Sequence, residues 1–403
     1  MKILIITQYY PPEIGAAATR WSEYAGIMTS RGHQVTVLSE LPNYPSGTIA
    51  AGYPKFKYFT EESTDPLLRV IRTPVWANPR KTTLQRLGFF ISFMISATLR
   101  ALLLPQYDLI IVSSPPLFVG LIATFLRPFK KAKYVLDLRD IWPESAQVLG
   151  EIKSERMLSF GRFLERMVYR SVDAFFLAVP GFRKYLAGRH PAQAAKLKLN
   201  LMNGVSKTFI DLVSNRTTSN NKKFTVLFSG NIGLAQGLET VLEAAKSLLP
   251  TDIIIKIIGD GAKRDALMLQ AESMRLSNVT FISSMSRELL ADQILSADIC
   301  LVPLIKSPLF LNAIPSKMLE YMAAGKPVIV GIKGEVEKLL SDSGAGVSID
   351  PENSSHLTEM ILEYKNSPER VKAEGLSGSE YIQAKMTKEV MLEQAMVGLF
   401  EDK

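Results

Sequence analysis

Hydrophobic and polar positions follow two alternating patterns along the first half of the chain. Short unbroken apolar runs, typical of strands buried on both faces, are followed by longer stretches with helical periodicity. The apolar runs predict strands at residues 2–7, 35–38, 68–72, 108–113, 134–138 and 174–179. The periodic stretches predict helices that end near residues 30, 104, 128 and 170. Because strands that alternate with helices form parallel α/β sheets, we expect one such sheet here.

The second half of the chain repeats this pattern. Apolar runs predict strands at residues 224–229, 253–258, 279–282, 299–302 and 328–330. We therefore predict an α/β protein with two Rossmann-like parallel-sheet domains, at residues 1–205 and 223–380. A polar linker at residues 206–222 joins them, and a C-terminal helix follows at residues 381–403. Since such sheets bind ligands at the carboxyl ends of their strands, we expect the two domains to face each other across a cleft.

Residues 312–331, with the sequence NAIPSKMLEYMAAGKPVIVG, combine a turn, a short helix, a glycine stop and a strand. Pro315 sets up the turn and Ser316 is a typical N-cap residue. Unpaired amides at such a helix start attract anions, and Lys317 adds a full positive charge. Glu320 lies one turn later on the same face and leans toward the helix start. A diphosphate beside a diol-bearing sugar would satisfy these groups together; an ordinary capped helix with a solvated glutamate is the alternative.

Three glycine-containing loops follow predicted strands. In the first, residues 11–17 (PPEIGAA), Gly15 and its small neighbours would let a ligand approach the backbone, although the loop is not a GxGxxG dinucleotide fingerprint. An ordinary strand-to-helix turn is the alternative. Residues 230–237 (GNIGLAQG) open a helix, and residues 259–261 (GDG) end a strand. All three loops are expected at the carboxyl ends of strands, where ligands bind.

Charged residues gather after the predicted strand 134–138. The sequence DLRDIWPE at residues 137–144 places Arg139 and Asp140 directly before a Trp-Pro pair. Charges at the carboxyl end of a strand are typical of a cleft wall rather than a solvated face. An internal Arg–Asp pair that rigidifies the loop is the alternative.

Residues 87–104 are long and apolar enough to approach the length of a transmembrane helix, with Arg100 as the single charge. Spanning is disfavoured because strands and helices alternate on both sides, and a span would separate the halves of one sheet. Two interpretations remain: a helix buried against the sheet, or a helix that dips into lipid with Arg80, Lys81 and Arg86 on the head groups. We favour a combination of the two, since burial alone does not explain the basic residues.

Charge is unevenly distributed over the 403 residues. The net charge is +8, but residues 1–203 carry 26 Lys and Arg against 14 Asp and Glu, a net charge of +12, while the remainder has a net charge of −4. The first half should therefore face an anionic partner, such as a lipid surface, a phosphorylated acceptor or nucleic acid. The single Cys300 indicates a reducing compartment. Metal-binding motifs such as HExxH, CxxC and Asp-x-Asp do not occur in the sequence, and we expect no metal, no signal peptide and a cytoplasmic protein.

Together these residues resemble glycosyltransferases of family 4, which have the retaining GT-B architecture, and especially bacterial O-antigen and capsule transferases of the L-fucosamine kind. The resemblance covers essentially the whole chain. Its most specific segments are TQYYPPEIGAAATRWSEYA, DLRDIWPES, SGNIGLAQGLETVLEAA, IIGDGAKRDAL and IPSKMLEYMAAGKPVI. It implies a UDP- or GDP-linked donor in the second domain, with an N-acetylated amino or deoxyamino sugar. It also implies no cofactor, a polyprenyl-diphosphate-linked glycan acceptor over the first domain, and a peripheral position on the cytoplasmic face of the inner membrane.

The resemblance also implies roles by position. Glu320 corresponds to the glutamate expected on the nucleotide ribose, and the turn that begins at Ile314 corresponds to the amides expected on the diphosphate. Arg139 and Asp140 stand where many members have a His-Asp pair near the transferred sugar. The candidate nucleotide-sugar-binding residues are Gly15, Gly230, Asn231, Gln236, Gly259, Asp260, Gly261, Asn312, Ile314, Pro315, Ser316 and Glu320.

Three positions depart from the family pattern. Asn312 replaces the first glutamate of E-x7-E, and Asn231 and Gln236 replace the basic pair of G-R-x4-K-G. Two cationic contacts to the diphosphate are thus missing, and we expect Lys317 and Arg139 to supply that charge.

The expected mechanism follows from the chemistry of sugar transfer. Lys317 and Arg139, together with helix N-termini, would stabilise the departing diphosphate. A retaining enzyme of this type would use front-face attack, with the leaving phosphate taking the acceptor's proton. Asp140 would polarise the sugar or orient the acceptor.

Three alternatives remain open. An epimerase of GT-B fold would turn over a UDP-sugar without an acceptor, and a catalytically silent membrane partner would explain the motif losses. A nucleic-acid-binding protein would explain the pI of 9.3. Because no basic helix with interleaved aromatic residues occurs, we expect no nucleic-acid partner.

Overall fold

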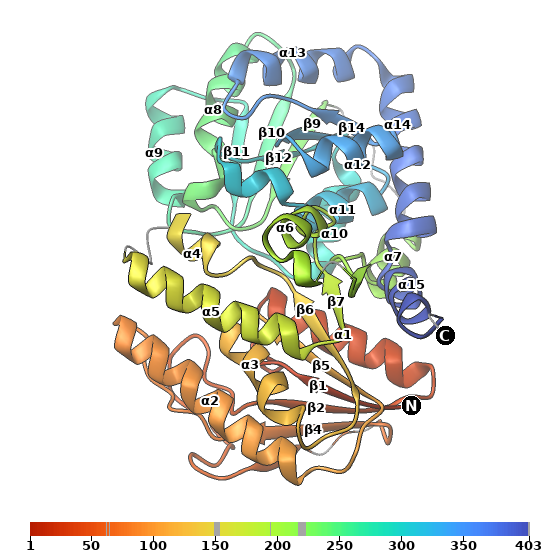
Figure 1. Cartoon of the computed structure of the whole chain (residues 1–403). Helices are drawn as coiled ribbons and strands as arrows, with labels where there is room; N and C mark the ends of the chain where they lie inside the picture. The colour runs from red at the N-terminus through yellow and green to blue at the C-terminus, as the bar shows by residue number, and fades with distance from the viewer. Residues whose placement is uncertain (62, 64, 149–153, 194, 217–222, 402–403) are drawn as a thin grey trace. The chain divides into compact units, whose positions relative to one another are not determined.

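The computed structural model describes the chain except residues 62, 64, 149–153, 194, 217–222 and 402–403. The chain divides into two compact units (Figure 1). The first unit contains residues Met1–Asn203 and the segment from Leu392 onward, and the second contains Gly204–Met391. Each unit is built on one sheet flanked by helices, as the alternating pattern of the sequence predicts.

The first unit has an eight-stranded sheet in the order β3-β4-β2-β1-β5-β6-β7-β8. Neighbouring strands are parallel except for the antiparallel edge pair β3–β4. The strands are β1 (Lys2–Ile6), β2 (Gln34–Glu40), β3 (Phe59–Glu61), β4 (Leu68–Thr73), β5 (Leu109–Ser114), β6 (Lys133–Leu138), β7 (Ala174–Leu177) and β8 (Leu197–Asn200). The helices are α1 (Ala16–Ser30), α2 (Thr83–Leu103), α3 (Leu117–Leu126), α4 (Glu144–Val148), α5 (Glu155–Ser171) and α6 (Phe182–Arg189), with a 3-10 turn η1 (Pro191–Gln193).

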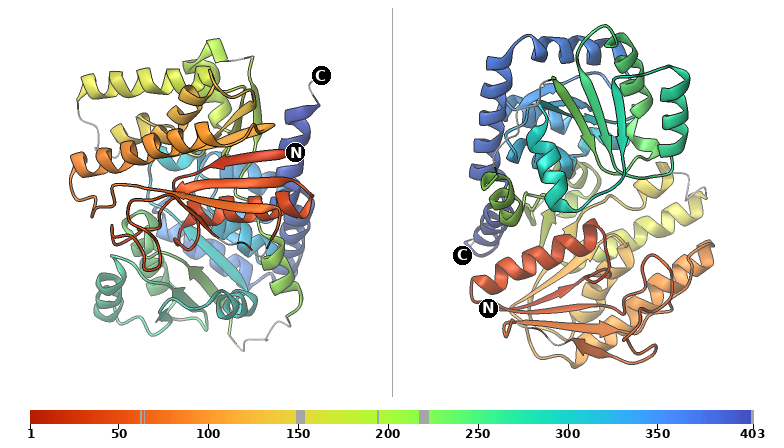
Figure 2. Two further views of the ribbon diagram at one scale, coloured as in Figure 1. Left: turned by 90° about the horizontal axis from the view of Figure 1, so that it is seen from below. Right: turned by 180° about the vertical axis from the view of Figure 1, so that it is seen from behind.

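Helices cover both faces of this sheet. Helices α2, α3 and α5 lie side by side on one face and α1 lies on the other (Figures 1 and 2). The central strands are buried on both faces, which explains their unbroken apolar runs. The edge strand β3 is half-exposed and has no such run, so the sequence pattern does not reveal it.

The second unit has a six-stranded, fully parallel sheet in the order β11-β10-β9-β12-β13-β14. Its strands are β9 (Thr225–Ser229), β10 (Ile254–Ile258), β11 (Val279–Ile282), β12 (Ile299–Pro303), β13 (Val328–Gly331) and β14 (Gly346–Ser348). Its helices are α7 (Lys207–Ser214), α8 (Leu238–Ser247), α9 (Arg264–Ser273), α10 (Arg287–Ser296), α11 (Ser316–Ala323), α12 (Glu335–Ser343), α13 (Ser354–Lys365) and α14 (Pro368–Tyr381), with 3-10 turns η2 (Leu234–Gln236) and η3 (Pro308–Asn312). A π-helical turn η4 (Ile382–Met386) and helix α15 (Lys388–Phe400) follow.

Two segments differ from the sequence prediction. The stretch 206–222, predicted as a linker, begins with helix α7 of the second unit, and residues 217–222 lie outside the described residues. The stretch 381–403, predicted as one helix, is interrupted by η4 before α15 begins. The backbone of Val205 pairs with Met386 (N–O 2.8 Å) and with Lys388 (O–N 3.0 Å), which fixes this interruption within the second unit.

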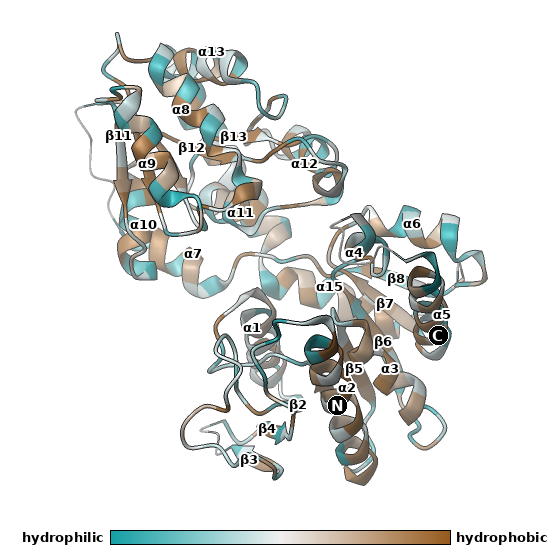
Figure 3. Ribbon diagram, turned by 90° about the vertical axis from the view of Figure 1, so that its left-hand side faces the viewer, coloured by the Kyte–Doolittle hydropathy of each residue, from teal (hydrophilic) through white to brown (hydrophobic). Residues whose placement is uncertain are grey.

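Helix α2 is apolar on nearly all sides. Within the part of the chain that the structure describes, it is the one helix long and apolar enough to cross a membrane by length and composition. One face packs on the sheet through Phe89, Phe93, Ala97 and Ala101. A second stripe at four-residue spacing, made of Ile91, Ile95, Leu99 and Leu103, is exposed. The predominantly brown ribbon of α2 in Figure 3 reflects both stripes. Helix α2 is therefore partly buried against the sheet and partly uncovered.

Both sheets reverse their strand order at one place. In the first sheet the chain moves from β1 toward β4 and then returns to β5 beside β1; in the second it moves from β9 toward β11 and returns to β12 beside β9. Ligands of open α/β sheets bind outside the carboxyl ends of the strands at such a point. The loops after β1, β5, β9 and β12 are therefore where each unit should hold a ligand.

Candidate functional site

Lys317 lies where three segments meet at the carboxyl edge of the second sheet. It is the second residue of α11; its Nζ donates to Gln236 Oε1 (3.1 Å) and lies 4.1 Å from the ring centroid of Phe228. A Cβ atom at Gly230 would lie 2.8 Å from this Nζ, so glycine leaves room for the ammonium. Burial lowers the pKa of Lys317 to about 8, although nearby Glu320 opposes the shift. A partly desolvated cation at the point of strand reversal is suited to bind an anion.

The start of α11 differs from the prediction in one detail. Pro315, not Ser316, is the N-cap residue, so the predicted N-cap at Ser316 is wrong. Proline has the fixed φ of −65° that this position needs here, and Ser316 becomes the first helical residue. The helix start consequently has no side-chain cap, which suits a site where a ligand takes the amide hydrogen bonds. At the other end, Gly325 is the glycine stop of the sequence prediction and has a left-handed conformation with φ of 69°.

Glu320 is paired with a cation that the sequence analysis did not single out. Arg287, the first residue of α10, lies with its Nη2 3.1 Å from Glu320 Oε1, and its guanidinium lies over the ring of Phe209. Burial raises the pKa of Glu320, and Arg287 opposes that shift. Arg287 thus favours the ionised carboxylate, which is the form that accepts hydrogen bonds from a ligand. The only sequence signal for Arg287 is its place soon after a predicted strand.

The glycine loops after β9 and β10 interlock. A Cβ atom at Gly259 would lie 1.9 Å from the carbonyl oxygen of Gly230, and one at Gly261 would lie 2.4 Å from that of Ile232. The backbone N–H of Ile232 donates to Asp260 O (2.8 Å), and the Asp260 carboxylate accepts from the backbone of Ser284 (2.9 Å). The two glycines thus allow the loops to pack backbone to backbone beside Lys317, which a side chain would prevent.

The three positions that depart from the family pattern lie in different surroundings. Gln236 contacts Lys317, while the Asn231 side chain lies against the backbone of Gly261. Asn312 ends η3 and is exposed, and Ile314 follows it in the turn that leads into α11. The Lys317 ammonium therefore lies beside Gln236, one of the two loop positions where the family pattern has a basic residue.

In the first unit, charged residues at the carboxyl end of β6 form a buried network with α1. Asp137 is fully buried and accepts from Arg20 (2.8 Å), from Trp21 Nε1 (3.0 Å) and from Ser113 Oγ (3.0 Å). Arg139 Nε lies 3.6 Å from the same carboxylate, so the alternative of an internal Arg–Asp pair is realised. Burial lowers the pKa of Arg139. Arg20, which the sequence analysis missed, is a buried charge on the inner face of α1.

Asp140 differs from Asp137 because it is partly exposed. It accepts a hydrogen bond from Ser145 Oγ (2.8 Å), which fixes the orientation of its carboxylate. Arg139 Nη2 donates to the carbonyl oxygen of Pro115 (3.2 Å) and ties this loop to the one after β5. Asp140 is thus the carboxylate of this loop that a ligand can reach.

The loop after β1 is held in place by the side chain of Glu13 and has free space beside Gly15. The buried Glu13 carboxylate accepts from the backbone amides of Asn43 (3.0 Å) and Tyr44 (2.9 Å). A Cβ atom at Gly15 would meet no atom within 4 Å, and the preceding Ile14 is exposed. The space in front of Gly15 allows the close approach of a ligand that the sequence predicts.

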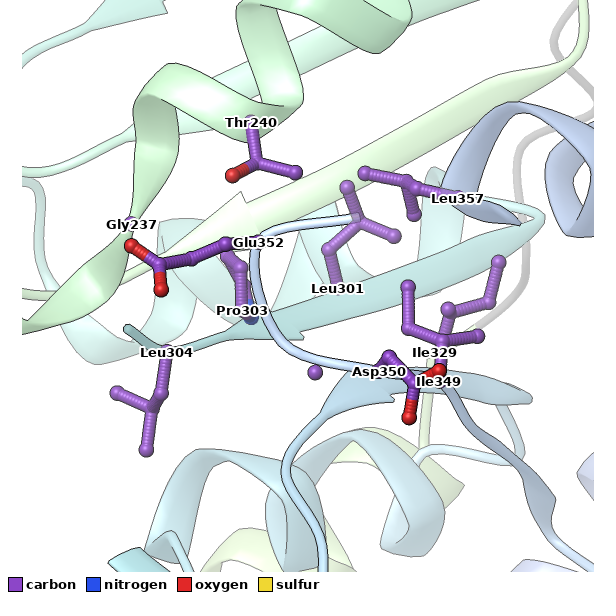
Figure 4. A pocket seen from close by; sticks show the side chains of 11 residues that line it. Gly237, Thr240, Leu301, Pro303, Leu304, Ile329, Ile349, Asp350, Glu352 and Leu357 are labelled. Carbon is purple, nitrogen blue, oxygen red and sulfur yellow. The ribbon is translucent and has the colours of Figure 1, made fainter. Parts of the chain in front are cut away.

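Another pocket in the second unit does not fit a phosphate ligand. It lies between Leu301, Ile329 and Leu357 of the core, with Asp350 and Glu352 at its side (Figure 4). The two carboxylates disfavour an anion. The rest of the pocket is lined mainly by apolar side chains above the sheet. Among the described residues, no group of three or more His, Cys, Asp or Glu side chains is placed to hold a metal ion.

Comparisons with known proteins agree with this division into two units. Residues 15–200 match a family described as glycosyl transferase 4-like domain, and residues 210–375 match the family of glycosyl transferases group 1. The chain is 25% identical, over 98% of both chains, to the putative colanic acid biosynthesis glycosyl transferase WcaI of Escherichia coli K12. It is 23% identical to the probable glycosyltransferase WbjE of Pseudomonas aeruginosa, over 67% of this chain and 68% of that protein.

Solved structures share the fold over the whole chain. Sucrose-phosphate synthase from Thermosynechococcus elongatus superposes with a TM-score of 0.71 at 18% identity, covering 100% of both chains. WaaG, a glycosyltransferase involved in lipopolysaccharide biosynthesis, gives 0.64 at 15% identity over 98% of this chain and 99% of that one. Anabaena HepE in complex with UDP gives 0.68 at 14% identity over 100% of both chains. The predicted fold class, two parallel-sheet domains of GT-B type, is thereby confirmed.

Proposed function

We propose that this chain moves a sugar, with retention of configuration, from a nucleotide diphosphate donor to a polyprenyl-diphosphate-linked glycan. The matches of its first half to the glycosyl transferase 4-like domain and of its second half to the glycosyl transferases group 1 support this proposal. We place this step in the assembly of a cell-surface polysaccharide, as the names of WcaI and WaaG suggest. The donor sugar is an N-acetylated amino or deoxyamino sugar on UDP or GDP, in line with the resemblance to L-fucosamine transferases.

One observation supports the donor site most directly. Lys317 places a partly desolvated ammonium beside Gln236 and Gly230, at the uncapped start of α11. A diphosphate there would accept from the ammonium and from the helix amides, and these donors gain strength because the site is partly shielded from water. Glu320, one turn along, is suited to accept from the two hydroxyls of a ribose.

The transfer follows from these groups. The bond between the anomeric carbon and the phosphate oxygen breaks, and the acceptor oxygen bonds to the same face of that carbon. The proton of the acceptor hydroxyl passes to the departing phosphate. Lys317 neutralises the charge that develops on the diphosphate, and Asp140 orients the acceptor or polarises the sugar. In this proposal the Lys317 ammonium takes the place of a dedicated metal ion.

The acceptor and the location are proposed from the first unit. Its sequence has a net charge of +12, and α2 exposes an apolar stripe, so we place the protein peripherally on the cytoplasmic face of the inner membrane. Of the three basic residues near the start of α2, Lys81 and Arg86 are exposed. Arg80 donates to Asn43 Oδ1 (3.2 Å) and to the carbonyl oxygen of Pro45 (3.2 Å), and Arg86 Nε donates to the carbonyl oxygen of Arg80 (3.1 Å).

A donor and acceptor screen tests this function. Purified protein is incubated with UDP- and GDP-sugars and a polyprenyl-diphosphate-linked sugar, and products are identified by mass spectrometry. We expect the lipid to gain the mass of one sugar with one donor class, and an Asp140→Asn variant to lose this product. Turnover of the nucleotide sugar in the absence of lipid would instead identify an epimerase. No turnover with any donor, together with unimpaired membrane binding, would identify a catalytically silent partner.

A further inference from the structure

An apolar groove of about 580 Å³ lies entirely within the first unit, between α2 and α5. Its volume is in the range of small-molecule sites. Both helices contribute their N-terminal halves, and α3 lies between them (Figure 1). Its apolar lining includes Leu87, Phe90, Phe118, Trp142, Met157 and Phe160. The Phe90 and Phe118 rings stack at 6.1 Å, which makes one rigid aromatic wall. The groove is therefore a built apolar surface rather than a gap between mobile side chains.

The groove is amphipathic in a specific way. Arg86 of α2 and Arg156 of α5 both line it and are both exposed. Asp140 and Ser145, whose hydrogen bond of 2.8 Å fixes the carboxylate, line it too. Two arginines, an apolar surface and the Asp140 carboxylate thus line the same groove.

We propose that this groove binds the diphosphate-proximal isoprenoid segment of the lipid-linked acceptor, with Arg86 and Arg156 on the acceptor's own diphosphate. The inference rests on the proposed function, because the acceptor is part of it. The groove volume admits only the first isoprene units, and the rest of the chain continues into the bilayer along the exposed stripe of α2.

Two observations favour this occupant over others. A phospholipid would satisfy the apolar lining and the arginines but has no reason to extend to Asp140, which is the carboxylate proposed to act on the acceptor. An apolar peptide would leave the two arginines facing an uncharged partner, which costs free energy, and residues 1–203 of a second copy would meet them with a net charge of +12. An isoprenoid diphosphate with a glycan beyond it matches the lining, the cations and Asp140 together.

The experiment uses the full chain and a benzophenone-modified farnesyl diphosphate, followed by peptide mapping with mass spectrometry. We expect cross-links within residues 83–90 or 156–164. Unmodified farnesyl diphosphate should compete for them; farnesol and phosphatidylglycerol should compete poorly. Cross-links that fall mainly elsewhere, or equal competition by phosphatidylglycerol, would overturn the proposal.

Matched variants separate the groove from general membrane attraction. Phe160 lines the groove and is 61% exposed, whereas Phe129 is 68% exposed and belongs neither to the groove lining nor to the exposed stripe of α2, so neither change to aspartate should disturb folding. Phe160→Asp should weaken farnesyl diphosphate binding about tenfold or more, and Phe129→Asp should not, since each loses one phenyl ring but only one loses a ligand contact. Likewise Arg156→Glu should weaken binding about tenfold, and Arg166→Glu on the same helix should not. Equal effects within either pair would refute the assignment.

Kinetic measurements show whether the groove assignment or the proposed glycosyltransferase function is wrong. If a lipid-linked sugar is glycosylated, Phe160→Asp should raise its KM and leave the KM of the nucleotide sugar unchanged. Glycosylation with an unchanged KM for the lipid would overturn the groove alone. If farnesyl diphosphate labels the groove but no lipid is glycosylated, the groove assignment is supported and the proposed function is overturned.

Discussion

The replacement Lys317→Met removes the ammonium from the proposed diphosphate site while keeping an unbranched apolar chain over Phe228. The ammonium donates to Gln236 Oε1 (3.1 Å), so its removal leaves this amide oxygen without that donor. A hydrogen bond to a charged group contributes about 1.5–3 kcal/mol, which corresponds to a loss of affinity between about tenfold and about a hundredfold. Calorimetric titration with UDP or GDP, whichever the donor screen selects, measures this loss.

The pH dependence of binding gives a second, sharper signature. The pKa of Lys317 is lowered by burial to about 8, so the free protein has the charge at pH 7 and loses it as the pH rises through 8. A bound diphosphate holds the proton more tightly. Above pH 8 the wild-type affinity should therefore fall by about tenfold per pH unit until the pKa of the complex is reached. Lys317→Arg stays charged over this range and should bind without that decline.

The free energy of unfolding of the unliganded protein should rise over the pH range in which the nucleotide affinity falls. Below pH 8 both the folded and unfolded states hold the proton, and the folded state is destabilised because it buries the charge. Between pH 8 and 10.5 the folded state releases its proton first, so this destabilisation is relieved as the pH rises. The shift corresponds to at most about 3 kcal/mol, reduced by the partial exposure of the side chain. Lys317→Met should thus be more stable than wild type at pH 7 in urea unfolding, and this advantage should disappear near pH 10.

A compensating variant completes the test. Gln236→Lys combined with Lys317→Met returns one ammonium to the other side of the same contact, and should recover most of the lost affinity. Unchanged nucleotide affinity in Lys317→Met would refute the role of this cation. Wild-type affinity that is constant from pH 7 to pH 10 would refute the same reasoning independently.

Three further substitutions have separable expected outcomes. Glu320→Gln should weaken nucleotide binding about tenfold in calorimetry, since a neutral amide accepts hydrogen bonds less strongly than a carboxylate; equal affinity would contradict the ribose assignment. Asp140→Asn should lower kcat in the mass-spectrometric assay and leave nucleotide affinity unchanged, and full turnover would remove Asp140 from the reaction. Asp137→Asn should lower the free energy of unfolding by about 3–5 kcal/mol in urea denaturation because Arg20 stays buried without its counter-ion; a loss below about 1 kcal/mol would show that the pair is dispensable.

The strands could be predicted wherever both faces of the sheet are covered. β1, β5, β9 and β12 are continuous apolar runs because helices pack on each side, and their sequence positions agree with the structure. β3 and β14 have three residues each and lack such runs, so no periodicity marks them. The start of α11 was misplaced by one residue because proline and serine both suit helix starts, and only the backbone decides between them.

The charged partners were harder to predict than the glycine loops. Gly230 and Gly259 follow strands and stand out locally, whereas the pair Arg20–Asp137 joins residues 117 positions apart and the pair Arg287–Glu320 joins residues 33 apart. A charge in an amphipathic helix looks solvated in sequence, and only the sheet order places α1 against β6. Arg20 could have been suspected because it precedes the buried Trp21 on the inner face of α1.

The contact between Lys317 and Gln236 shows that either of two segments can place a positive charge in the proposed diphosphate site. The loop after β9 and the start of α11 flank the same point of strand reversal, so a cation on either one reaches the same space. The family that the sequence resembles has basic residues at positions 231 and 236 of the loop, whereas this chain has Asn231 and Gln236 there and Lys317 at the start of α11. Burial disfavours the proton on Lys317 more than Glu320 favours it, which explains why the pKa of Lys317 falls rather than rises in the absence of an anion. A diphosphate reverses this balance, so ligand binding and proton uptake should be coupled at this site.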